Sequence, residues 1–284
     1  LKRIMSMKIN PLLSRQASRV ILLTASLITP LLLASSAHAA NQAQGQPRYN
    51  VLMVIVDDMD ADLCSAFRQD APVKTPNMDR IARRGTWFSH AYNAGSTCCP
   101  SRTALLTGVA PARSGVYYND QAYRRSKTFI SKVETLPRHF LNAGYLTAGY
   151  GKITHQRYGA DDASDYTPGY FKRMDGPEVT NTDEMLIAAA DPQTLVDGLP
   201  AINGWGQLPD DWDRSDSPPE KLTQDTQQAN RTIEFLGENH ERPFFLACGF
   251  FRPHARWIVP KRYFDMHPIN TIKIPAGYLA GDLE

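Results

Sequence analysis

An apolar run that ends in two adjacent aspartates limits the folds open to this chain more than any other feature. Residues 50–56 read Asn-Val-Leu-Met-Val-Ile-Val, and Asp57-Asp58 follow at once. A continuous apolar, β-branched run is typical of a strand buried on both faces, as in a parallel sheet covered by helices. Such sheets bind ligands at the carboxyl ends of their strands, and a hard divalent cation would relieve the repulsion between neighbouring carboxylates. A solvated strand end or a helix cap is the alternative explanation of the pair.

Further apolar strands alternate with helical segments along the chain, which predicts an α/β fold with a largely parallel sheet between helices. Helices are predicted where a capping residue or an early proline precedes an amphipathic stretch. Residues 156–217 are rich in Asp, Gly, Pro and Tyr without a clear period, and we expect long loops there that shape a substrate pocket. The expected helices are residues 77–84, 133–143 and 219–239, and the expected further strands are residues 145–150 and 244–251.

The most informative motif, residues 96–108, places a cysteine close to a proline and an arginine. Pro100 suits the first turn of a helix, so Cys98 is expected at the positive N-terminal end, which attracts anions and lowers the pKa of a thiol. Arg102, about one turn further on, adds a cation that could hold an oxyanion. The motif therefore predicts a nucleophile directed at an anionic ester, with a buried cysteine before an ordinary helix as the alternative.

Three blocks of the chain resemble the type I sulfatases, in the order in which that family has them. Residues 98–108, Cys-x-Pro-Ser-Arg followed after two residues by Leu-Leu-Thr-Gly, resemble the family's main signature. Residues 144–155 resemble its second signature, and their Lys-x-x-His spacing is that of the iduronate sulfatase branch. Residues 243–261, which include Arg-Pro-His, also resemble that branch. The resemblance spans roughly residues 50–284 and implies an alkaline-phosphatase-like fold.

The resemblance also implies a modified nucleophile and a metal ion. In this family the cysteine is oxidised to formylglycine, an aldehyde that hydrates to a geminal diol. One hydroxyl of the diol attacks sulfur, and the other loses its proton and expels sulfate. The implied ion is Ca2+, held by Asp57, Asp58 and the modified Cys98. The implied roles of the basic residues are to hold the diol (Arg102), to bind the sulfate oxygens (Lys152), to act as base on the diol (His155) and to protonate or stabilise the leaving oxygen (His254).

Each basic residue outside the cysteine motif also has a simpler explanation. Lys152 could be a surface charge, while His155 and His254 could be polar loop residues. Only in series with Cys98 do they indicate a site. Two of the remaining cysteines, Cys64 and Cys248, are expected to be buried small residues or a disulfide; Cys99 occupies a variable position of the motif, and Lys261 has no implied role.

The N-terminus has the pattern of an export signal. Five basic residues precede an apolar stretch over residues 20–34, and Ala-His-Ala closes the segment at Ala39. We expect a signal peptide over residues 1–39, cleaved after Ala39, and a linker over residues 40–49, which predicts a periplasmic or secreted protein without a stable membrane anchor. An uncleaved anchor is the alternative.

The net charge of the chain without this segment is −3. Five of the 31 Lys and Arg lie in residues 1–39, which leaves 26 basic residues against 29 Asp and Glu. A nucleic-acid-binding body is therefore not indicated.

The resemblance is incomplete in one respect. The family completes its metal site with a later Asp-Asn or Asp-His pair, and neither dipeptide occurs in this chain. We therefore expect residues 50–284 to be the N-terminal portion of a sulfatase domain whose C-terminal part is missing, and to be inactive alone. The expected substrate is a sulfated small molecule or glycan, and the resemblance to the iduronate sulfatase branch implies a glycan that contains uronic acid. The expected partner is a formylglycine-generating enzyme. The alternatives are a phosphoesterase or phosphonate hydrolase of the same superfamily and an inactive fragment.

Overall fold

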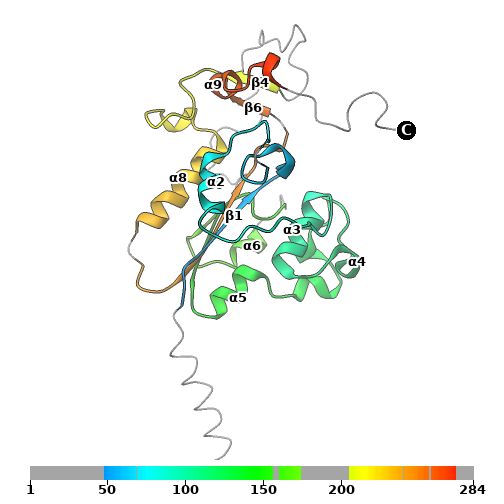
Figure 1. Cartoon of the computed structure of the whole chain (residues 1–284). Coiled ribbons are helices and arrows are strands. Elements are labelled where there is room, and N and C mark those ends of the chain that lie inside the picture. The colour runs from blue at the N-terminus through cyan, green and yellow to red at the C-terminus, as the bar shows by residue number, and fades with distance from the viewer. Residues whose placement is uncertain are drawn as a thin grey trace, which may run out of the picture. The chain divides into compact units, whose positions relative to one another are not determined.

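The larger sheet among the described residues has four strands, and every strand pair in it is parallel (Figure 1). Its order is β1 (Val51–Val56), β5 (Phe244–Phe250), β2 (Leu146–Gly151) and β3 (Phe171–Arg173). This computed structural model describes residues 48–68, 70–155, 160–173, 205–238, 240–255 and 257–272. The predicted α/β fold with a parallel sheet is confirmed.

Helices cover both faces of the sheet because β5 alternates its side chains between them. Phe244 and Leu246 pack with Phe235 of α8 (Gln224–Gly237) on one face. On the other face, Phe245 and Ala247 pack with residues of α3 (Cys98–Thr107) and α5 (Leu136–Asn142). Burial of a large apolar side chain of this kind contributes about 1.5–3 kcal/mol. In Figure 1, α8 lies on one side of the sheet, and α3 and α5 lie on the other.

The expectation that residues 50–56 are buried on both faces is wrong. β1 lies at the edge of the described sheet, where it pairs with β5. Its burial alternates, and the side chains of Leu52 and Val54 are 47% and 53% exposed. They share a face with the β5 residues that α8 covers, but α8 packs over β5 and β2.

The predicted helices exist with shorter bounds. The first is α2 (Pro76–Ala82). Within residues 133–143, α5 begins only after Thr135, whose hydroxyl accepts the Arg138 amide, and a separate 3-10 turn, η3, covers Phe129–Lys132. Residues 219–239 likewise divide into η4 (Pro219–Lys221) and α8. The observed helices are shorter than the predicted ones because caps and 3-10 turns, which the amphipathic pattern does not reveal, set where each helix begins.

The expectation of long loops over residues 156–217 is wrong in part. Within this stretch the structure describes α6 (Ala160–Ala163), β3 and β4 (Trp205–Leu208). β4 pairs in parallel with β6 (Trp257–Pro260) to form a second, two-stranded sheet. Residues 156–159 and 174–204 lie outside the described residues. The remaining elements are η1 (Ala61–Leu63), α4 (Pro111–Ser114), η2 (Tyr123–Arg125), α9 (Lys261–Asp265) and η5 (Ile269–Thr271).

The chain divides into two units, Leu1–Tyr49 and Asn50–Glu284. The predicted signal peptide, its cleavage point at Ala39 and most of the predicted linker lie outside the described residues. In the part of the chain that is described, no helix has the length and apolarity needed to cross a membrane.

The carboxyl ends of three neighbouring strands position the candidate site. β1 leads into Asp57, β2 into Lys152, and β5 into residues 251–254. The backbones of β2 and β5 approach closely there, and the Lys152 amide donates to the Gly249 carbonyl over 2.9 Å. A Cβ at Gly249 would collide with the Lys152 carbonyl, and Gly151 has a φ of 84°. Glycine at both positions therefore brings Lys152 into the site.

Candidate active site

Asp57 is the centre of a buried cluster of charges at the end of β1. Its Oδ1 accepts a hydrogen bond of 2.7 Å from Arg102, and its Oδ2 pairs with the Lys152 ammonium. Burial raises the pKa of Asp57, but the hydrogen bonds and charges of Arg102 and Lys152 outweigh it and hold the pKa below its ordinary value. The carboxylate is therefore ionised and held between two cations.

Arg102 joins α3 to the turn that follows β2. One guanidinium nitrogen donates to the carbonyls of Lys152 and Ile153, over 2.5 and 3.1 Å, while the other binds Asp57. The Arg102 and Asp57 side chains are only 6% and 7% exposed. A planar guanidinium suits this task because its donors point in several fixed directions.

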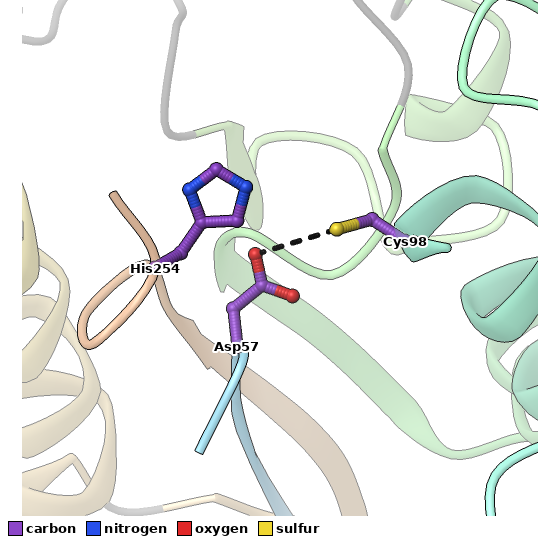
Figure 2. Close-up of side chains that lie close together, drawn as sticks. All are labelled: Asp57, Cys98 and His254. Carbon is purple, nitrogen blue, oxygen red and sulfur yellow. Dashed lines mark hydrogen bonds between the residues drawn. The ribbon is translucent and has the colours of Figure 1, made fainter. Parts of the chain in front are cut away.

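Cys98 is the first residue of α3, as predicted, and its Sγ lies 3.9 Å from Asp57 Oδ2 (Figure 2). The expectation of a lowered thiol pKa is wrong. Burial and then the Asp57 carboxylate raise the pKa of Cys98, and the nearby Lys152 and Arg102 do not compensate. The thiol is therefore a poor thiolate nucleophile in this environment.

His254 approaches the same point from the loop after β5. Its Nδ1 lies 2.5 Å from the Ala255 carbonyl, which assigns a proton to Nδ1 and leaves Nε2 as the ring nitrogen that faces the site. Nε2 lies 3.8 Å from Asp58 Oδ2. One donor atom each of Asp57, Cys98 and His254 lies within 4.8 Å of the others, and Figure 2 shows the three side chains converging from separate segments.

Asp58 occupies the outer side of the site. It has a φ of 55°, which is unusual for a residue other than glycine, and its side chain is 55% exposed. This conformation turns the backbone sharply directly after Asp57, so that two successive side chains flank one site. Asp57 and Asp58 offer the oxygen ligands that Ca2+ prefers, whereas the soft thiol of Cys98 does not suit that ion. The residues fit calcium once Cys98 carries oxygen in place of sulfur.

His155 lies near the same charges, three residues beyond Lys152. Its Nδ1 is buried and has no hydrogen-bond partner among the described residues. Burial and then the charge of Lys152 lower the pKa of His155, which favours the neutral imidazole. Among the described residues this nitrogen is therefore open to a hydrogen bond with a further group.

A second charged cluster holds the turn that carries Lys152 and His155. The Thr154 hydroxyl donates to Asp162 over 2.8 Å, and Asp162 lies 3.7 Å from the Arg124 guanidinium. Asp165 accepts from the Thr135 hydroxyl over 2.6 Å. These buried carboxylates link α5 and η2 to the Lys152–His155 turn.

The sequence did not single out two residues that contact the site or its loop. The centroid of the Phe251 ring lies 4.3 Å from Lys152 Nζ and 4.6 Å from the centroid of the His254 ring, to which it is tilted by 40°. Asp225, at the start of α8, binds the backbone of the same loop. The only signal for Asp225 was an acidic residue in the first turn of a helix, which is too common to single out. The loop contact depends on the tertiary structure.

The other cysteines and Lys261 take no part in the site. All four thiols are free, and Cys64 and Cys248 are buried, which confirms the expectation of small buried residues and not that of a disulfide. Cys99 is buried and its thiol donates to the Gln121 carbonyl. Lys261 pairs with Asp265 on the surface of α9.

Comparison with known proteins identified one family. The sequence profile of the Sulfatase family matches residues 49–271. A sulfatase of Formosa agariphila is 32% identical over 241 residues, and human iduronate 2-sulfatase is 29% identical over 235 residues. These matches cover 82% and 79% of this chain but 44% and 38% of the relatives, so the chain spans less than half of their length.

Two solved structures share the fold. One is a protein in complex with its substrate D-glucosamine-2-N,6-O-disulfate, with a TM-score of 0.55 and 21% identity, covering 81% of this chain and 40% of that protein. The other is the phosphonate monoester hydrolase of Agrobacterium radiobacter, with a TM-score of 0.51 and 25% identity, covering 77% of this chain and 44% of that one. The expected alkaline-phosphatase-like fold is confirmed.

Proposed function

Because this chain belongs to the sulfatase family, we propose that the whole protein hydrolyses sulfate esters at the site around Asp57 and Cys98. The observation that carries the proposal is the meeting of Cys98 at the start of α3 with Asp57, Arg102 and Lys152. A nucleophile, an anion-binding pair of cations and carboxylate ligands for a metal ion lie together there.

The nucleophile is formylglycine made from Cys98 by a maturation enzyme. The place of Cys98 as the first residue of α3, within the Cys-x-Pro-Ser-Arg motif, supports this. A hydroxyl of the hydrated aldehyde forms the new bond to sulfur, and the ester S–O bond breaks to release the alcohol. When the second hydroxyl loses its proton, the C–O bond to sulfate breaks and the aldehyde returns.

Each basic residue of the site has a separate role in proton transfer or in binding negative charge. Neutral His155, with its unpaired buried nitrogen, takes the proton from the diol. Lys152 binds the sulfate oxygens, Arg102 holds the diol, and His254 protonates the leaving oxygen. Asp57, Asp58 and the modified residue 98 would hold Ca2+, which would supply a fixed positive charge for the sulfate group. These residues give too few oxygen ligands for calcium, so we expect the 284 residues alone to be inactive.

The substrate class is a sulfated small molecule or glycan. Human iduronate 2-sulfatase and the complex with a disulfated glucosamine are both named for sulfated sugars, which supports a glycan, including one that contains uronic acid. The N-terminal pattern over residues 1–39 supports a periplasmic or secreted protein cleaved after Ala39. Nucleic acid and a stable membrane anchor are not expected.

A phosphonate or phosphate ester is the second candidate substrate. The likeness to the phosphonate monoester hydrolase of Agrobacterium radiobacter favours it, because the cations and carboxylates at the site would bind either anion. An inactive fragment is the remaining alternative.

The test compares aryl sulfate with aryl phosphate turnover by the full-length protein, coexpressed with a formylglycine-generating enzyme. Mass spectrometry of the tryptic peptide from Gly85 to Arg102 reports the conversion of Cys98. We expect sulfate turnover that Cys98→Ser abolishes and the matched Cys99→Ser retains. Preference for the phosphate would favour the second candidate, and an unmodified thiol with no turnover would refute the proposal.

A further inference from the structure

Asp225 holds the loop that delivers His254, although it lies outside the cluster of site residues. One carboxylate oxygen accepts the Phe251 amide over 2.6 Å, and the other accepts the Arg252 amide over 2.8 Å. Each oxygen therefore pairs with one of two successive amides. Hydrogen bonds from amides to a carboxylate are stronger than bonds between neutral groups.

The loop that Asp225 binds carries two side chains of the site. The Phe251 ring contacts both the Lys152 ammonium and the His254 ring. The His254 amide in turn donates to the Phe251 carbonyl over 3.1 Å. A displacement of the Phe251 backbone would therefore move both His254 and the aromatic face beside Lys152.

Asp225 is itself attached to a rigid element. It lies in the first turn of α8, and Phe235, further along that helix, is buried against β2 and β5. The carboxylate is thus fixed with respect to the strands that end at Asp57 and Lys152. Burial raises the pKa of Asp225, and the two amide bonds act in the opposite direction, so these bonds offset part of the desolvation.

We propose that Asp225 is a positioning residue, which fixes the Phe251–His254 loop so that His254 faces Asp57 and Cys98. It touches no reacting atom and acts through the loop backbone. The effect on turnover rests on the proposed function, whereas the effect on the loop does not.

The first test is amide hydrogen exchange on the 284-residue chain. In Asp225→Ala, we expect the amides of Phe251 and Arg252 to exchange about 10- to 100-fold faster, because each loses a charge-assisted bond. Asp225→Asn should have an intermediate effect, since its carbonyl oxygen can still accept one amide. The β5 amides within the sheet should keep their wild-type rates.

Thr223→Ala is the matched control at the same end of α8. The Thr223 hydroxyl donates to Asp213 over 2.9 Å, and among the described residues no hydrogen bond joins that hydroxyl to the loop. This variant disturbs the start of the helix but should leave exchange at Phe251 and Arg252 unchanged. The proposal is overturned if Asp225→Ala leaves those two amides protected, or if all of β5 exchanges faster to the same degree.

The second test measures kinetics on the matured full-length protein. We expect Asp225→Ala to lower kcat about 10- to 100-fold with little change in KM, because a displaced His254 affects the bond-breaking step more than binding. An unchanged kcat together with a loosened loop would overturn the positioning role. A loosened loop in a protein whose wild type lacks sulfatase activity would refute the proposed function and leave the structural inference intact.

Discussion

Replacement of Arg102 by methionine should strongly destabilise the protein. The change removes one bond to Asp57 and two bonds to the carbonyls of Lys152 and Ile153. Asp57 stays buried with Lys152 as its one remaining cationic partner at the site. Removal of one partner from a buried ion pair costs about 3–5 kcal/mol, mostly because the other charge is left uncompensated.

Urea unfolding measures this loss directly. With a slope near the upper end of the usual range of about 1–3 kcal/mol per M, the midpoint of Arg102→Met should fall by about 1–2 M. Arg102→Lys keeps the charge but lacks the planar guanidinium, so its urea midpoint should lie between those of the wild type and Arg102→Met. The control, Arg68→Met, removes an exposed pair with Asp70 and should leave the midpoint unchanged.

The Asp57→Asn/Arg102→Met double variant separates charge from packing. If uncompensated charge dominates, neutralising Asp57 should recover part of the stability lost in Arg102→Met. A midpoint shift for Arg102→Met of less than about 0.3 M would refute the assignment of Arg102 as a buried support of the site.

Three further outcomes are expected. Gly249→Ala should prevent stable folding, because its Cβ would meet the Lys152 carbonyl. The control, Gly237→Ala, has open space around its Cβ and should not lower the midpoint of thermal unfolding. Equal midpoints for the two variants would contradict the close approach of Gly249 to Lys152. The raised pKa of Asp225 means that the folded state binds more protons than the unfolded state from about pH 3.8 up to the folded pKa, so the free energy of unfolding falls as pH rises through that window. Asp225→Asn should remove this part of the slope in urea titrations at several pH values, and an unaltered slope would assign it to other groups. Calcium at 100 times its Kd should stabilise the matured full-length protein by about 2.7 kcal/mol in thermal unfolding, and Asp58→Asn should reduce this gain; an equal gain in the variant would exclude Asp58 as a ligand.

Local patterns in the sequence predicted three of the strands, β1, β2 and β5, and the helix start at Cys98. The apolar run before Asp57 could form little else than a strand, and Pro100 placed Cys98 at a helix start as the structure has it. Residues in such motifs are near one another along the chain, so their spacing and backbone preferences are enough to predict the local secondary structure. The Lys152 and His254 segments were identified by resemblance, and their roles stay predictions.

Only the tertiary structure decided what surrounds each of these residues. It placed β1 at the edge of the described sheet and exposed Leu52 and Val54, although the run resembles a central strand. It also raised the pKa of Cys98, since desolvation and the Asp57 carboxylate come from residues distant in the chain. The contact of Asp225 with the loop spans 26 residues and leaves no local pattern. Strand neighbours, burial and charge pairs depend on which segments meet in space, and periodicity along one segment carries no information about its partner.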